Sequence, residues 1–124
     1  MDSITHIVTG AVIADIFFEK PKKKLVFVLG TITASLPDFD VILYLFYDFR
    51  EMLSIHRGLS HSIFFNLIIG FLISILFSKY KLLGEYKFIK ILTFTYLCLA
   101  SHLLLDVFTA YGTQVLLPFS NFRI

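Results

Sequence analysis

Long apolar runs separated by short polar linkers dominate the chain. The runs cover residues 4–18, 25–49, 63–77 and 91–111, and polar side chains are few within them. Their lengths suit helices, and the alternation that marks a half-buried strand is absent. Pro37 interrupts the second run, because proline removes a backbone donor and biases the preceding residue away from helix. The pattern predicts an all-α bundle of about four helices, whose second helix is broken at Pro37-Asp-Phe-Asp40.

Composition places this bundle in a membrane. Hydrophobic residues make up 57% of the 124-residue chain and charged residues 16%, whereas about a quarter of a soluble domain is charged. We expect one domain over residues 1–124, surrounded by membrane lipids. The net charge of +2 is too small to indicate nucleic acid, so we expect no such partner. Cys98, the lone cysteine, predicts a small core residue. The alternative is a very apolar soluble bundle.

The basic residues of the linkers predict how the helices cross the membrane. The first linker holds four lysines within 20–24, and the third holds four within 79–90. The second, 48–61, holds two arginines, and two acidic residues accompany them. By the positive-inside rule, the first and third linkers face the cytoplasm. We therefore predict a multi-pass protein of a prokaryotic cytoplasmic membrane, with the second linker and both termini outside.

This topology brings ionisable side chains of different runs to the outer side. His6 lies at the outer end of the first helix, and His56 and His61 lie in or beside the outer linker. At about 1.5 Å per residue, Asp38 and Asp40 lie roughly 20 Å along the second helix. His102 and Asp106 are in the outer half of the last helix. Because the histidines were not used to derive the topology, their convergence predicts a site toward the extracytoplasmic side.

Two pairs of residues in this set suit metal binding. His102 and Asp106 are four residues apart, so a helix places them on one face. Imidazole and carboxylate suit zinc and similar divalent ions; the alternative is a structural hydrogen bond within the pair. Asp38 and Asp40 share a face only in an extended segment. Otherwise one is a ligand or a base and the other orients a histidine, or one caps the second half-helix.

The polar segment 56–62 contributes two more histidines. His61 adjoins the start of the third helix, with Ser60 or Ser62 as its N-cap, and is the better ligand candidate. His56 is either a ligand or a contact to a substrate phosphate. Arg57 is either an anion clamp or an interfacial anchor. By itself, His6 is more typical of an interfacial histidine, and Asp15, nine residues further along, faces away from the site.

Together these motifs resemble the YdjM/YbcI-type family of membrane-bound metal-dependent hydrolases. The matching elements are Thr5-His6, Leu36-Pro-Asp-Phe-Asp40, His56-Arg-Gly-Leu-Ser-His61-Ser62, His102-Leu-Leu-Leu-Asp106, Thr109-Ala-Tyr-Gly112 and Leu117-Pro-Phe-Ser120. They cover nearly the whole chain in the family's order. Ser60 stands where threonine is more frequent, and the chain stops at Ile124 where relatives continue, so we expect a truncated or unusually short member. The family is distantly similar to zinc-dependent phospholipase C and the single-strand-specific zinc nucleases.

The resemblance implies hydrolysis of a phosphoester by a metal-activated water. The expected ligands of one or more divalent ions, zinc first among them, are His6, Asp38, His56, His61, His102 and Asp106. Asp38 or Asp40 would orient or deprotonate the water. A lipid phosphoester is the expected substrate, because the site lies near the headgroup layer. The rival hypothesis is a non-catalytic membrane protein, such as an ion-binding scaffold or a transporter component.

Overall fold

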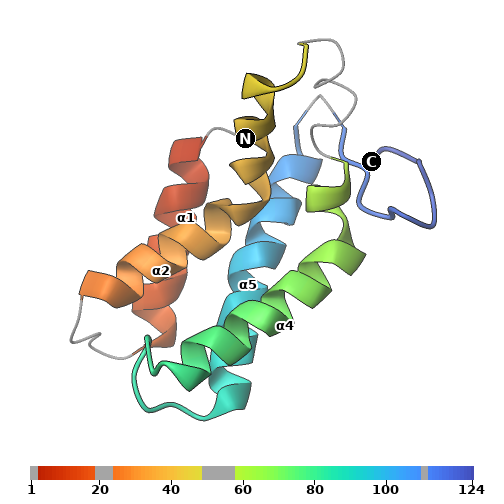
Figure 1. The fold of residues 1–124 in the computed structure, drawn as a ribbon. Coiled ribbons are helices and arrows are strands. Elements are labelled where there is room, and N and C mark those ends of the chain that lie inside the picture. Colours follow the sequence, from red (N-terminus) through yellow and green to blue (C-terminus); the bar gives the residue numbers. More distant parts are fainter. Residues whose placement is uncertain (1–2, 19–23, 49–57, 110–111) are drawn as a thin grey trace.

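The protein is an all-helical bundle in the part of the chain that the structure describes. This computed structural model describes residues 3–18, 24–48, 58–109 and 112–124. Within these ranges it has four α-helices, two 3-10 segments and no strand (Figure 1). The elements are α1 (Ser3–Phe17), α2 (Lys24–Ser35), η1 (Leu36–Leu45), η2 (Leu59–His61), α4 (Ile63–Lys79) and α5 (Phe88–Val107). The all-α prediction with four helices is confirmed.

The helix bounds follow the apolar pattern closely, except in α5. This helix begins at Phe88, before the predicted start at Ile91, and ends at Val107, before the predicted end at Tyr111. The apolar run 91–111 therefore overestimates where this helix ends. The helix ends earlier because the carbonyl of Asp106 accepts two hydrogen bonds from Thr109, from its N–H at 3.0 Å and from its hydroxyl at 2.7 Å.

The predicted break in the second helix is present. The α-helical conformation ends at Ser35, and the chain continues as the 3-10 segment η1, in which Pro37 is buried. A 3-10 helix joins each carbonyl to the N–H three residues later. Pro37 has no N–H, so it cannot donate to the carbonyl of Ala34. That carbonyl remains open to a donor from another element.

Successive helices run in opposite directions along the bundle (Figure 1). α1 packs on α2, α4 packs on α5, and α5 also contacts both α1 and α2. The start of α1, the end of α2 with η1, the segment η2 and the end of α5 therefore lie at one end of the molecule, the upper end in Figure 1. We call this the polar end, because the ionisable residues of η1, η2 and α5 lie there.

Small residues allow α1 and α2 to approach each other closely. The buried positions of α1 are His6, Gly10 and Ala14, one helical turn apart. A Cβ atom added at Gly30 of α2 would lie 2.6 Å from the carbonyl oxygen of Gly10, so neither glycine leaves room for a side chain. Close packing through small residues is typical of helix pairs within membranes.

On α4, many large apolar side chains are exposed on the outside of the bundle. The buried face of α4 carries Asn66, Gly70 and Ser74 besides Phe77. Its exposed side chains include Leu67 and Leu72, which are 51% and 54% exposed. An amphipathic helix of a soluble protein buries its apolar face and exposes its polar one. The arrangement here is the reverse, and it presents an apolar surface to the surroundings.

Helix length limits which of these elements can cross a bilayer. Among the described residues, α5 is the one helix long and apolar enough to do so, with 20 residues. At about 1.5 Å per residue it extends roughly 30 Å, the thickness of a bilayer's hydrocarbon core. α1 and α4 are apolar too, but they are shorter, with 15 and 17 residues.

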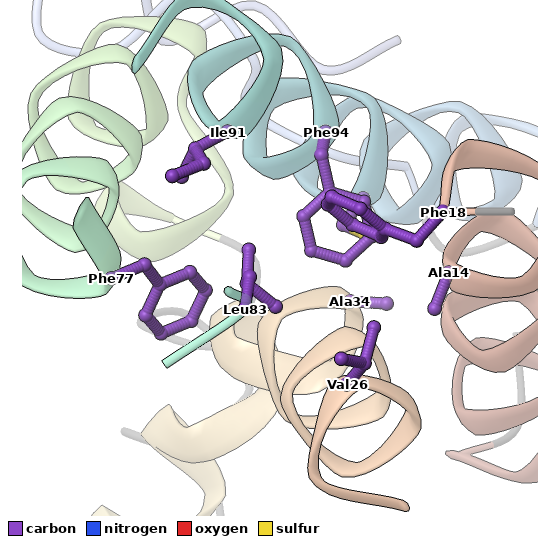
Figure 2. Packing of buried hydrophobic residues seen from close by; sticks show 9 residues of the cluster. Ala14, Phe18, Val26, Ala34, Phe77, Leu83, Ile91 and Phe94 are labelled. Carbon is purple, nitrogen blue, oxygen red and sulfur yellow. The ribbon is translucent and has the colours of Figure 1, made fainter. Parts of the chain in front are cut away.

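The end of the bundle opposite the polar end has an aromatic and aliphatic core, which we call the apolar end. Figure 2 shows Phe18, the residue that follows α1, beside Phe94 of α5. The centroids of these two rings are 4.9 Å apart, and both side chains are fully buried. Val26, Phe77, Leu83 and Ile91 belong to the same buried cluster. Side-chain packing therefore joins all four helices at this end.

Candidate metal centre

Three histidines and two aspartates meet at the polar end. His6 comes from α1, Asp38 from η1, His61 from η2, and His102 and Asp106 from α5. The histidine side chains are completely buried and that of Asp106 is 1% exposed, whereas that of Asp38 is 22% exposed. The structure therefore brings together five of the residues that the sequence predicted, and solvent reaches this cluster at Asp38.

Four of these residues are arranged like the ligands of one ion. Asp38, His61, His102 and Asp106 offer ligand atoms that all lie within 4.8 Å of one another. His61 Nε2 lies 3.2 Å from His102 Nε2, 3.2 Å from Asp106 Oδ2 and 3.4 Å from Asp38 Oδ1. His102 Nε2 lies 3.5 Å from Asp38 Oδ1 and 3.4 Å from Asp106 Oδ2. Ligands of tetrahedral zinc, with bonds of about 2.0–2.1 Å, are about 3.3 Å apart. The residues fit such an ion.

The broken helix α2 fixes the orientation of His102. The Nδ1–H of His102 donates a hydrogen bond of 2.7 Å to the carbonyl of Ala34, the group that Pro37 leaves without a 3-10 donor. A neutral imidazole protonated on Nδ1 has its lone pair on Nε2, which here faces the cluster. Metal-binding histidines commonly donate their second N–H in this way. The predicted helical pair of His102 and Asp106 thus gains an orienting partner from a distant helix.

Ser60 and Asp40 orient His61 from its other nitrogen. Ser60 Oγ lies 3.0 Å from His61 Nδ1 and donates a hydrogen bond of 2.9 Å to Asp40 Oδ2. Asp40 Oδ2 is also 3.9 Å from His61 Nδ1. Asp38 is at Nε2, so the two aspartates lie at opposite nitrogens of the same ring. Asp40 therefore contacts the cluster on the far side of the His61 ring, beside Ser60.

Asn66 holds the turn that presents His61. Its side-chain amide donates to the carbonyls of Ser60 and Ser62, at 2.8 and 2.9 Å. Ser62 is the N-cap of α4 and accepts a hydrogen bond of 3.1 Å from the N–H of Phe65, as one of the two predicted caps. Sequence reasoning assigned no role to Asn66, although a buried amide within an apolar run is a signal, because it needs polar partners.

His6 is buried in the cluster, and its side chain makes no hydrogen bond to another described residue. Its ring stacks on that of His102, with centroids 3.9 Å apart and planes inclined by 23°. Its Nε2 lies 3.3 Å from Asp106 Oδ1 and 3.9 Å from Asp38 Oδ2. Neither ring nitrogen has a hydrogen-bond partner among the described residues. A buried polar group in this state is costly, and binding to a metal ion would relieve that cost at Nε2.

The electrostatics of the cluster favour a cation. Burial opposes a charge on His61, but hydrogen bonds to the carboxylates of Asp106 and Asp38 outweigh that effect and raise the pKa of His61 above its ordinary value. The same two carboxylates contact His6 and His102. In the absence of a metal ion, positive charge in the cluster must come from protons. A divalent ion would therefore compete with protons for these nitrogens.

Among the other positions considered in the sequence, the structure describes Asp15 and Cys98. His56 and Arg57 fall outside the described residues. Asp15 is exposed on α1, away from the buried face that carries His6. Cys98 is completely buried in α5 and belongs to the apolar cluster, in agreement with its predicted core role.

The chain matches a family model and a bacterial protein of known sequence. The family model described as YdjM inner membrane protein matches residues 1–124. The uncharacterized protein YfhP of Bacillus subtilis (strain 168) is 31% identical over 132 residues. This alignment covers 98% of the present chain but 38% of YfhP, so the chain spans well under half the length of that relative. No solved structure matches the chain.

Proposed function

This chain belongs to the YdjM inner membrane protein family, and on that premise we propose that it is a membrane-bound, metal-dependent phosphoester hydrolase. The observation that carries the proposal is a set of five distances, between 3.2 and 3.5 Å, that join the Nε2 atoms of His61 and His102 to each other and to carboxylate oxygens of Asp38 and Asp106. Nitrogen and oxygen ligands at tetrahedral spacing suit zinc. Zinc is accordingly the ion that we propose.

We place the bundle in the cytoplasmic membrane as one multi-pass domain. The outward apolar side chains of α4, the close contact of Gly10 with Gly30 and the length of α5 support this placement. The lysine-rich first and third linkers favour the orientation in which the polar end faces the extracytoplasmic side. The cluster would then lie near the lipid headgroups, and a lipid phosphoester is the substrate that we propose.

Residues of the cluster would have different roles in such a reaction. A bound zinc ion would lower the pKa of water toward about 7 and polarise a phosphoryl oxygen. His61 and His102 offer their Nε2 atoms to the ion, because their Nδ1 atoms are held by Ser60 and by Ala34. Asp38 borders solvent and would orient the attacking water by accepting a hydrogen bond from it. Asp40 would act as a positioning residue, through Ser60 and His61.

One observation favours a second candidate function, a non-catalytic ion-binding protein. The four residues Asp38, His61, His102 and Asp106 would complete a tetrahedron by themselves. Structural zinc sites have four protein ligands, whereas catalytic sites have three and keep one position open. A single ion in this set would therefore resemble a structural ion.

Hydrolysis of a generic phosphodiester separates the two functions. We expect zinc-loaded protein in detergent to hydrolyse bis(p-nitrophenyl) phosphate, and Asp38→Asn to reduce the rate by roughly 100-fold or more. Asp15→Asn is the matched control, because Asp15 is exposed on α1, and it should keep full activity. Metal content is measured on each sample.

Lipid specificity is then measured with phospholipid vesicles, from the water-soluble phosphate compounds that are released. Full metal content without hydrolysis of either substrate would contradict the proposal and support the ion-binding protein.

A further inference from the structure

Each of the two aspartates in the cluster faces His61 and His102 with one carboxylate oxygen and His6 with the other. Asp106 presents Oδ2 to His61 and His102, at 3.2 and 3.4 Å, and Oδ1 to His6, at 3.3 Å. Asp38 presents Oδ1 to His61 and His102, at 3.4 and 3.5 Å, and Oδ2 to His6, at 3.9 Å. Each carboxylate thus has one oxygen in the tetrahedral set and its second oxygen toward His6. This is the arrangement of a carboxylate that bridges two cations.

His6 cannot share an ion with His102 in this geometry. An imidazole binds a metal ion along its nitrogen lone pair, in the plane of the ring. The rings of His6 and His102 are stacked, with centroids 3.9 Å apart and planes inclined by 23°. Their Nε2 atoms contact the same two carboxylates, so the rings point the same way. Their lone pairs therefore run side by side and do not meet at one point.

We infer that the centre holds two divalent ions, the second of them bound by His6 Nε2, Asp106 Oδ1 and Asp38 Oδ2. The inference rests on the proposed function for the first ion. His6 supplies the independent observation, because it is completely buried and neither of its nitrogens has a hydrogen-bond partner among the described residues.

The two positions differ in how many protein ligands they have. The first is surrounded by four, namely Asp38, His61, His102 and Asp106. Among the residues that the structure describes, the second has three, namely His6, Asp38 and Asp106. Three protein ligands and an open position are characteristic of catalytic zinc. The position at His6 is therefore the one that accepts water or a substrate oxygen, and Asp38, which borders solvent, is one of its ligands.

Metal stoichiometry tests the inference without reference to activity. The full chain is purified in detergent, dialysed against zinc and assayed by elemental analysis. We expect two ions per chain in the wild type and one in both His6→Ala and His6→Gln. Thr9→Val is the matched control on the same helix and should keep two ions, because the Thr9 hydroxyl donates to the carbonyl of Thr5 within α1. One ion in the wild type, or two in both His6 variants, would overturn the inference.

Manganese loading gives a second readout that does not depend on the variants folding. Two Mn²⁺ ions joined by carboxylates give a spin-coupled electron paramagnetic resonance spectrum, whereas isolated ions give a six-line spectrum. We expect the coupled spectrum in the wild type, and an isolated-ion spectrum at full loading would overturn the inference. Two ions without phosphodiester hydrolysis would contradict only the proposed function. Hydrolysis with one ion would contradict only the second site.

Discussion

The two ends of the bundle are stabilised by different interactions. At the apolar end, Phe18, Phe94 and Ile91 are packed among aliphatic side chains and are buried to 99% or more. At the polar end, imidazoles and carboxylates from separate elements lie within 3.2–3.9 Å of one another. Dispersion contacts suffice at the first end. At the second, buried polar groups must be balanced by protons or by metal. The apolar end thus forms the scaffold, and the polar end depends on what it binds.

Removal of a central ligand should have the largest effect. We expect His102→Ala to lose the ion of the tetrahedral set, since it deletes one Nε2 ligand and the hydrogen bond to Ala34. Cys98→Ala is the matched control, one turn earlier on the same buried face of α5. Elemental analysis of both purified variants is the measurement. Undiminished metal in His102→Ala would show that the cluster is not the metal site.

A cavity at the apolar end should lower the stability of the protein and leave its metal content unchanged. Phe94 is completely buried and contacts the rings of Phe17 and Phe18. We expect Phe94→Ala to lower the free energy of unfolding by roughly 3–5 kcal/mol, measured by denaturant titration in detergent. Metal stoichiometry at saturating zinc should be unchanged. Lost metal with unchanged stability would show that the two ends are not separate.

Acidification should weaken metal binding at the polar end. The raised pKa of His61 means that a proton is held there to higher pH than on an ordinary histidine. Zinc must displace that proton, so its affinity should fall as the pH falls, by roughly tenfold per pH unit for each proton released. Competition titrations with a chelator between pH 8 and pH 6 would measure the change. Constant affinity would mean that no histidine proton is exchanged for the ion.

The smallest effect should come from the residues that orient His61. Asp40→Asn weakens the acceptor of the Ser60 hydroxyl without touching a ligand atom of the tetrahedral set. We expect zinc affinity to fall by about 10–100-fold, with stoichiometry retained at saturating zinc. Asp15→Asn serves as the exposed control. A complete loss of zinc in Asp40→Asn would instead make Asp40 a direct ligand.

Much of this architecture could be predicted because local rules decide it. The lengths of the apolar runs predicted the helices, and Pro37 predicted the break in the second one. The four-residue spacing of His102 and Asp106 placed both side chains on one face, 3.4 Å apart. The alternating directions of the helices then carried His6, Asp38 and His61 to the same end as this pair.

The rest depends on contacts between distant segments. Nothing in the sequence near His102 indicates that its Nδ1 meets the carbonyl of Ala34, because a backbone acceptor has no residue signature. The stacking of His6 on His102 depends on how α1 packs against α5, two helices that are far apart in the sequence. The end of α5 was misplaced because a hydrogen-bonded turn at Thr109 stops the helix before the apolar run is over.

The carbonyl of Ala34 has a consequence for the order of assembly. Its partner, His102, is synthesised 68 residues later. During translation the end of α2 must therefore wait for α5 before this hydrogen bond can form. Asp106, which faces every histidine of the cluster, is synthesised later still. A partly synthesised chain thus has no complete set of candidate ligands until α5 has been made.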